Sequence, residues 1–153
     1  MSAEFVHRRL VEFSETDMAG IVHFANFLRW MESAEHAFLR SLGHSVHPAS
    51  REQASGWPRV KVGCEYRSPL RFEQEVEVIL RVEEVRNRSV RYRFTVRAVG
   101  AEEPAALGEI VAVYAVVDVL EGGLRAAPIP PGLREQLLAW VSNADQIGRE
   151  VDR

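Results

Sequence analysis

The sequence predicts an α+β fold in which one long helix packs against an antiparallel sheet. Two observations carry this prediction. Apolar residues recur every three or four positions over residues 24–42, and the period changes to two over residues 75–98. The helix comes first and several strands follow it, which is typical of an α+β domain rather than of alternating strand–helix units. A long apolar helix needs a sheet face to cover it, so we expect a curved sheet to wrap around this helix.

The helix is predicted from one apolar stripe along an otherwise polar segment. The stripe consists of Phe24, Phe27, Leu28, Met31, Ala34, Phe38 and Leu42. Gly43 follows its last member and predicts the end of the helix, because glycine readily adopts the left-handed conformation found after helix ends. Before the helix we expect a strand over residues 5–13 and a loop over residues 14–20.

Four further strands are expected after the helix, over residues 60–66, 76–82, 90–98 and 108–117. The last of these is apolar almost throughout, as expected for a central strand covered on both faces. A hairpin turn is predicted at residues 86–88. Residues 44–57 show no clear period and predict a loop or a short helix. Three prolines at 128, 130 and 131 end the sheet, and a short helix is expected to begin near Pro131.

Length and composition fit a soluble globular protein. The chain has 153 residues, of which 46% are hydrophobic and 27% charged, enough to bury a core without disulfides. The formal net charge of −3 predicts neither nucleic-acid binding nor attraction to anionic membranes, and membrane insertion is not expected. The single cysteine, Cys64, cannot form an internal disulfide, and the first residues do not resemble a signal peptide. We therefore expect one cytoplasmic domain over residues 1–153, with its core at about residues 5–138.

Residues 13–27, FSETDMAGIVHFANF, contain the strongest candidate for a catalytic group. Asp17 lies in a predicted loop ahead of the helix, and the small pair Ala19-Gly20 would let a ligand approach the backbone. The first N–H groups of a helix lack internal partners and can stabilise an oxyanion. A nearby carboxylate can act as nucleophile or activate water. A thioester suits such a site, since its thiolate leaves readily. The alternative, that Asp17 only caps the helix, is favoured by the local pattern alone.

Two stretches resemble the 4-hydroxybenzoyl-CoA thioesterase-like branch of the hotdog-fold superfamily. The first is TDMAGIV at residues 16–22 with ANFLRW at residues 25–30. The second is VGCEYRSPL at residues 62–70, followed by VEV at residues 76–78. The segment PIP at residues 128–130 also fits the end of this family, so that the resemblance covers about residues 5–138.

The resemblance implies a hotdog fold, in which a curved antiparallel sheet wraps one long helix, and hydrolysis of acyl-CoA thioesters. It implies a homodimer or homotetramer with its active site at a subunit interface, and no cofactor or metal. Asp17 falls on the family's catalytic carboxylate. Phe24 falls on the position whose backbone N–H polarises the thioester carbonyl. Many relatives have His or Tyr at this position, and Phe24 supplies neither an imidazole nor a phenol.

Six further residues are candidates for substrate binding: Gly20, Val22, His23, Asn26, Arg86 and Arg88. His23 is either an acid–base group or a partly buried, hydrogen-bonded histidine. Asn26 either supports the site by bonding the loop or satisfies local backbone groups. Arg86 and Arg88, with Arg91 and Arg93, either bind the phosphates of CoA or belong to an ordinary soluble strand face.

Two other functions remain open on the sequence alone. A hotdog (R)-enoyl-CoA hydratase resembles this fold but uses a His five positions after its Asp, whereas His23 lies six positions after Asp17. A non-catalytic acyl-binding module is the other alternative, because a fold does not prove an activity. The acyl group is not predicted, and an acyl carrier protein is a possible donor in place of CoA.

Overall fold

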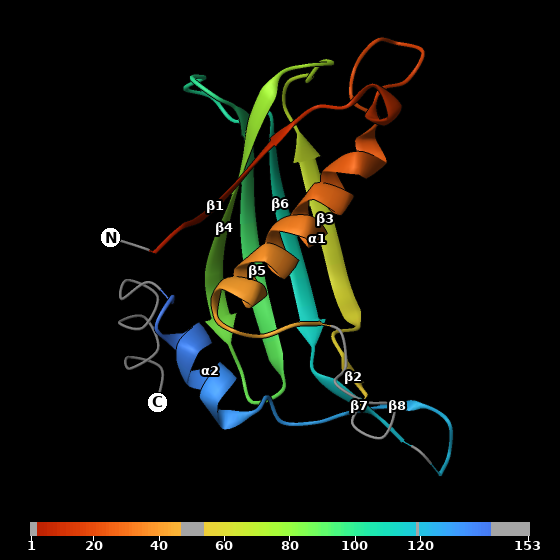
Figure 1. Ribbon diagram of the computed structural model, residues 1–153, viewed down its shortest axis with the longest axis vertical. Helices are drawn as coiled ribbons and strands as arrows, with labels where there is room; N and C mark the ends of the chain where they lie inside the picture. Colours follow the sequence, from red (N-terminus) through yellow and green to blue (C-terminus); the bar gives the residue numbers. More distant parts are fainter. Residues whose placement is uncertain (1–2, 47–53, 119, 142–153) are drawn as a thin grey trace.

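The computed structural model describes residues 3–46, 54–118 and 120–141. The elements in chain order are β1 (Phe5–Leu10), η1 (Phe13–Glu15), α1 (Phe24–Ser41), β2 (Ser55–Gly56), β3 (Arg59–Tyr66), β4 (Glu75–Val85), β5 (Ser89–Ala98), β6 (Ala106–Val113), β7 (Ala115–Val117), β8 (Leu124–Ala126) and α2 (Pro131–Leu138). Five antiparallel strands form the main sheet in the order β1-β4-β5-β6-β3, and α1 lies across one face of it (Figure 1). The predicted α+β architecture is confirmed.

The core lies between α1 and the covered face of this sheet. The strand register places Leu80, Phe94 and Gly108 side by side across β4, β5 and β6. Leu80 and Phe94 are buried there, and from the helix Trp30 and Met31 are fully buried against the sheet. In β5 every second side chain is buried under the helix, which is the burial that the period of two predicted.

Both predicted ends of the long helix are confirmed. The helix begins at Phe24, and the preceding residue, His23, is its N-cap and accepts a hydrogen bond from the Ala25 N–H. At the other end Gly43 has a φ of +86°, and its N–H donates to the carbonyl of Arg40 at 2.9 Å. Glycine adopts this left-handed conformation without steric cost, so the helix stops where the sequence indicates.

The first predicted strand is too long, because the chain turns after Leu10. Residues Phe13–Glu15 form the 3-10 helix η1 in place of the strand's expected end. The N–H of Glu12 donates to Oε1 of Glu15 at 2.8 Å and stabilises this turn. The loop that carries Asp17 therefore starts from a fixed turn rather than directly from a strand.

The strand predicted over residues 108–117 is two strands. Tyr114 interrupts it, and its N–H donates to the carbonyl of Arg88 at 2.7 Å. The chain then enters a three-stranded sheet in the order β2-β7-β8. The residues of β8 are all exposed, so no hydrophobic period in the sequence predicted this strand. In the stretch 44–57, β2 is a short strand, and residues 47–53 lie outside the described part of the chain.

The candidate residues lie at the two opposite ends of the main sheet. At one end Leu10 pairs with Glu75, and the chain continues through the Asp17 loop into α1. At the other end the predicted turn at residues 86–88 joins β4 to β5, and α2, which starts at Pro131 as expected, packs beside β4. Eleven residues of β4 separate the two ends by about 33 Å. Neither helix of the described residues is long and apolar enough to cross a membrane.

Candidate active site

Asp17 lies in a tight loop in front of α1. Its N–H donates to the carbonyl of Ile21 at 3.0 Å, and Thr16 pairs with Val22 to close the loop. Gly20 has a φ of +75°, which favours glycine at this turn. Oδ1 of Asp17 accepts from the Ala19 N–H at 2.9 Å, and the residue is exposed. Since His23 is the N-cap of α1, the alternative that Asp17 caps this helix is wrong.

Asp17 borders a cavity of about 460 Å³ beside the start of α1. The lining residues are Asp17, Ile21, Val22, Phe24, Phe27, Tyr66, Arg67, Ser68 and Pro69. The wall is therefore mostly apolar, with one carboxylate and one guanidinium among its polar groups. The structure brings Asp17, Val22 and Phe24 together here. Gly20 lies on the other side of Asp17, in an apolar hollow with Phe13, Met18 and Phe72.

The start of α1, beside this cavity, leaves one backbone donor without a partner among the described residues. The N–H of Ala25 donates to Nδ1 of His23 at 3.2 Å, and the N–H of Asn26 donates to the carbonyl of His23 at 3.0 Å. The N–H of Phe24 has no partner among the residues that the structure describes. It belongs to the positive end of the helix dipole, so it is available to a ligand oxygen.

Tyr66 fixes this first turn of the helix from the end of β3. Its hydroxyl donates to the carbonyl of Phe24 at 2.9 Å, and its ring meets Phe27 edge-on with 5.1 Å between ring centroids. Burial raises the pKa of Tyr66 to about 12, so the hydroxyl stays protonated and remains a donor. Nearby Cys64 is half-buried, and burial raises the pKa of its thiol, which argues against a nucleophilic role.

Glu15 connects the Asp17 loop to the core. Its Oε2 accepts from Arg9 and from the indole N–H of Trp30, each at 2.6 Å. Burial opposes ionisation of Glu15, but hydrogen bonds from the Glu12 N–H and Trp30 and the charge of Arg9 outweigh it, and the pKa is lowered. The ionised carboxylate of Glu15 thus stabilises the position of the loop between β1 and α1.

Asn26 belongs to the same support. It is buried, and its side-chain N–H donates to the carbonyl of Glu15 at 2.7 Å. Of its two interpretations, the structure favours the one in which Asn26 bonds the loop. His23 donates its backbone N–H to the same carbonyl at 2.9 Å. The His23 ring is exposed and stacks on Phe24, so the expectation of a partly buried histidine is wrong, while that of a hydrogen-bonded one holds.

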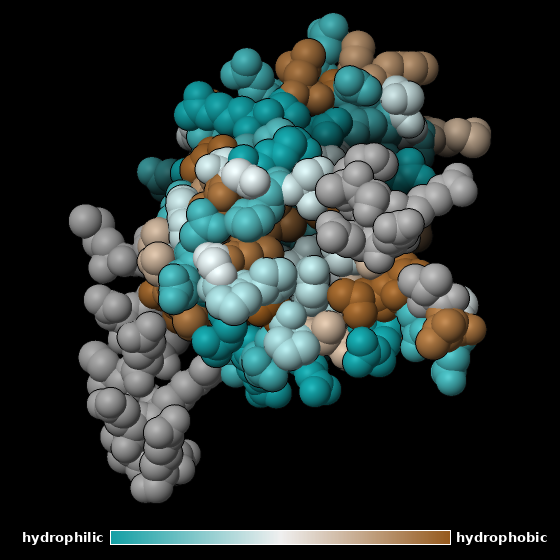
Figure 2. Space-filling view, turned by 60° about the horizontal axis from the view of Figure 1, so that its bottom comes forward, coloured by the Kyte–Doolittle hydropathy of each residue, from teal (hydrophilic) through white to brown (hydrophobic). Residues whose placement is uncertain are grey.

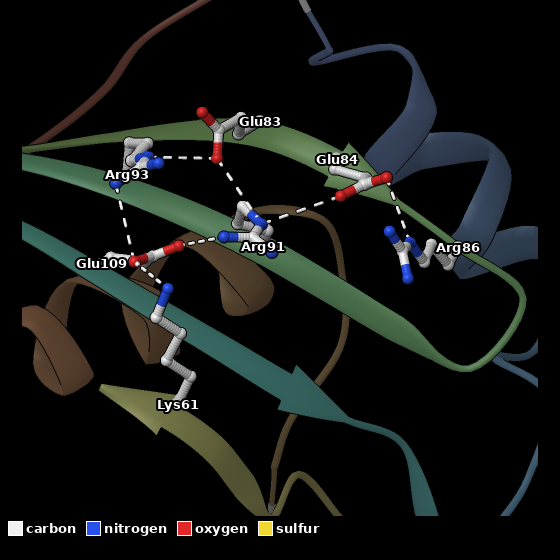
Figure 3. Close-up of polar contacts among 7 residues, drawn as sticks. All are labelled: Lys61, Glu83, Glu84, Arg86, Arg91, Arg93 and Glu109. Atoms are coloured by element: carbon white, nitrogen blue, oxygen red, sulfur yellow. Dashed lines mark hydrogen bonds and ion pairs between the residues drawn. The ribbon is translucent and has the colours of Figure 1, made fainter. Parts of the chain in front are cut away.

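Arg86 and Arg88 do not join Asp17 within one chain. They lie in the turn at the far end of the sheet, toward which Figure 2 looks, and the surface there is mainly hydrophilic with separate apolar patches. Arg86 pairs with Glu84 at 3.1 Å, and Figure 3 shows the two side chains turned toward each other. The same figure shows Arg91 and Arg93 engaged by glutamates of the sheet face that α1 leaves uncovered. The charges of Arg86, Arg91 and Arg93 are balanced by these glutamates, which supports the interpretation as a soluble strand face.

Two other arginines lie next to the Asp17 loop. Arg67 lines the cavity and pairs with Glu65 at 3.1 Å, and Nη1 of Arg71 donates to the carbonyl of Gly20 at 3.4 Å. The sequence reasoning did not single out these residues, Tyr66 or Glu15 by role. In the described residues no group of three or more His, Cys, Asp or Glu side chains is placed to hold a metal ion.

Comparison with known proteins identifies the family. A model described as the thioesterase-like superfamily matches residues 11–137. The chain belongs to this superfamily. A protein of Aquifex aeolicus with a provisional esterase name is 37% identical over 107 residues, which are 69% of this chain and 78% of that protein. The predicted hotdog fold and the prediction of a thioesterase are confirmed at the level of the family.

Other superfamily members have more specific names. A 1,4-dihydroxy-2-naphthoyl-CoA hydrolase of Synechococcus is 36% identical over 80 residues, which are 49% of this chain and 54% of that protein. The solved structure of a gentisyl-coenzyme A thioesterase is 29% identical, with a TM-score of 0.73 over 84% of this chain and 98% of that one. The superfamily's thioesterase fold therefore extends over most of this chain.

Proposed function

We propose that this protein hydrolyses acyl-CoA thioesters to a free acid and CoA, with Asp17 as nucleophile or general base. One observation carries the proposal. The Asp17 carboxylate lines the same cavity as Phe24, whose N–H has no partner among the described residues. A thioester placed between them would meet an attacking group on one side and an oxyanion donor on the other. The relatives that are named for CoA thioesters support the same chemistry.

Two routes fit this arrangement. In the first, Asp17 takes a proton from water, the water oxygen attacks the carbonyl carbon, and the C–S bond breaks to release the CoA thiolate. In the second, an Asp17 oxygen attacks the carbon and expels the thiolate, and water then hydrolyses the mixed anhydride. In both routes the Phe24 N–H stabilises the oxyanion. Hydrolysis in ¹⁸O-labelled water places the label in Asp17 only in the covalent route, provided that water attacks the Asp17 carbonyl carbon of the anhydride.

The candidates for substrate binding have different roles, because they lie at different places in the fold. Val22 contributes to the cavity wall, and Gly20 shapes the turn beside Asp17. His23 and Asn26 act indirectly, because they hold the start of the helix and the loop. Arg67 and Arg71 lie beside the Asp17 loop, where a guanidinium suits the phosphates of CoA. Arg86 and Arg88 stay outside the site of their own chain, so we give them no part in it.

We further propose that the active form is a homodimer or a homotetramer. Strand β3 is an edge of the main sheet, and its Val60 is 62% exposed. An edge strand with exposed apolar side chains favours pairing with another chain. The end of β3 carries Tyr66 and Arg67 into the cavity, so a second copy at this edge would also close the open side of the site.

Release of free thiol, followed with a chromogenic thiol reagent, tests the proposed activity. The substrates are aromatic and straight-chain acyl-CoAs and the same acyl groups on an acyl carrier protein. Turnover of one or more of them is the expected result. Loss of the enoyl absorbance of crotonyl-CoA without thiol release would instead indicate a hydratase. Calorimetric binding of acyl-CoA without turnover would indicate an acyl-binding module.

A further inference from the structure

The inner end of the cavity is closed by Phe27. Phe27 lines the cavity but is only 3% exposed, whereas Asp17 at the mouth is exposed. The ring packs on two other aromatic rings, with centroid distances of 5.2 Å to Trp30 and 5.1 Å to Tyr66. Tilted and edge-on aromatic pairs of this kind stabilise the position of the ring. Val22 is the other buried residue of the lining, with 4% exposure, so Phe27 and Val22 together form the floor of the cavity.

Behind this floor the next turn of the helix presents Met31. Met31 is fully buried, and a Cβ at Gly108 would overlap its thioether, so Met31 fills the space directly above this glycine. The neighbour of Gly108 in β3 is the small residue Cys64. The layer behind Phe27 is thus filled by the flexible side chain of Met31, and the strand residues beneath it, Gly108 and Cys64, are small. One further turn along, the buried Glu35 binds Arg59 through contacts of 2.8 and 2.9 Å, and this ion pair ends the apolar column.

We propose that Phe27 sets the maximum length of the acyl group, with Met31 as a second barrier behind it. This inference rests on the proposed thioesterase function. The CoA part of the substrate carries several phosphate charges, which are costly to bury in an apolar pocket without partners. The acyl group therefore enters the buried end, and it must stop at the Phe27 ring. The site selects short or compact acyl groups, and long straight chains are excluded.

The test measures kcat/KM for straight-chain acyl-CoAs from butanoyl to dodecanoyl with three variants. Phe27→Ala removes the floor, and the double variant Phe27→Ala/Met31→Ala removes the second barrier as well. Phe38→Ala is the matched control, because Phe38 is a fully buried phenylalanine of the same helix that packs on Phe5, Tyr92 and Trp140 away from the cavity.

We expect the wild type to prefer the short substrates. Phe27→Ala should move the optimum to longer chains, and the double variant should move it further. The ratio of kcat/KM for long over short substrates should rise by about fourfold for each additional buried methylene. Phe38→Ala should unfold at a lower temperature but keep the wild-type profile. A Phe27→Ala profile equal to that of Phe38→Ala would overturn the proposal, as would a wild type that already hydrolyses dodecanoyl-CoA best.

Two additions keep the test decisive. If Phe27→Ala does not fold, Phe27→Leu and Phe27→Trp replace it, and they should lengthen and shorten the accepted chain, respectively. If the wild type hydrolyses none of the substrates, the proposed function has failed, but the floor can still be tested by binding. The rise in melting temperature with each acyl-CoA should then shift to longer chains in Phe27→Ala, and an unchanged pattern would reject the role of Phe27.

Discussion

At the scale of single residues, Tyr66 shows how a side chain from the sheet can prepare the start of a helix for chemistry. The Tyr66 hydroxyl donates to the carbonyl of Phe24, and the N–H of Phe24 is the proposed oxyanion donor. The raised pKa keeps this hydroxyl protonated at every pH at which a thioesterase would be assayed. Tyr66 is therefore a positioning residue, which acts through Phe24 rather than on the substrate carbonyl itself.

Tyr66→Phe should lower kcat by up to about tenfold and leave KM nearly unchanged, because a hydrogen bond that orients the donor is worth about 1 kcal/mol. Steady-state kinetics with the best substrate measures kcat and KM separately and checks that only kcat falls. The matched control is Tyr114→Phe, which removes a hydroxyl from a tyrosine that packs on Trp57 at the other end of the molecule. Equal kcat values for Tyr66→Phe and the wild type would remove the positioning role.

At the scale of elements, Glu15 joins η1 to its neighbours, since its side chain contacts Arg9 in β1, Trp30 in α1 and the backbone N–H of Glu12 just before η1. Its folded-state pKa lies below the ordinary value of 4.5. A lowered pKa stabilises the fold at every pH above the unfolded value, and this contribution is lost as the pH falls through the folded value. The loop that presents Asp17 should therefore loosen in acid.

Urea unfolding of the wild type and of Glu15→Gln over a series of pH values measures this contribution. The difference in unfolding free energy should be constant well above pH 4.5 and should shrink toward zero as the pH falls below it. Glu103→Gln is the control, because Glu103 is an exposed glutamate in the turn between β5 and β6, outside the Asp17 loop. A difference that does not change with pH would mean that the charge of Glu15 does not hold the loop.

The elements differ in how well the sequence could predict them. The long helix and strand β5 follow from their periods, because one face of each is more buried than the other, and β4 keeps the period of two in its sequence although Glu77 and Ile79 are buried on its second face. The break at Tyr114 and the exposed strand β8 have no such signal, since they depend on contacts with distant segments. For the same reason the roles of Tyr66 and Glu15 were not predicted. Tyr66 bonds a residue 42 positions away, and Glu15 a side chain 15 positions away.

At the site itself, local chemistry made Asp17 a candidate, and the family resemblance then implied its catalytic role and the oxyanion role of the Phe24 N–H. The local pattern alone favoured a helix cap, and only the fold places the cap at His23 and leaves Asp17 in the cavity wall. The sequence left two interpretations of Arg86 and Arg88, as ligands of the CoA phosphates or as part of a strand face, and it could not decide between them without the positions of these residues in the fold. In the fold, Arg86 is about 33 Å from the Asp17 end of β4, and glutamates balance its neighbours.

At the scale of the whole molecule, the two edges of the main sheet allow the proposed assembly to be tested. Sedimentation should give a mass of at least about 35 kDa, twice that of one 17.3 kDa chain. Val60→Lys places a charge on the β3 edge and should lower the mass to that of one chain, together with the activity. Val6→Lys makes the same change on the β1 edge, where Val6 is 44% exposed. This variant should keep both the mass of the assembly and the activity. Dissociation by Val6→Lys alone would place the interface at β1.

The central claim is that the carboxylate of Asp17 carries the reaction, and thiol release by Asp17→Asn tests it most directly. The control is Asp118→Asn, since Oδ1 of Asp118 accepts from the N–H two residues later, as Oδ1 of Asp17 does. We predict that Asp17→Asn lowers kcat by about 10²–10⁴-fold with folding and assembly unchanged, while Asp118→Asn stays at the wild-type rate. Equal turnover by Asp17→Asn and the wild type would contradict the account.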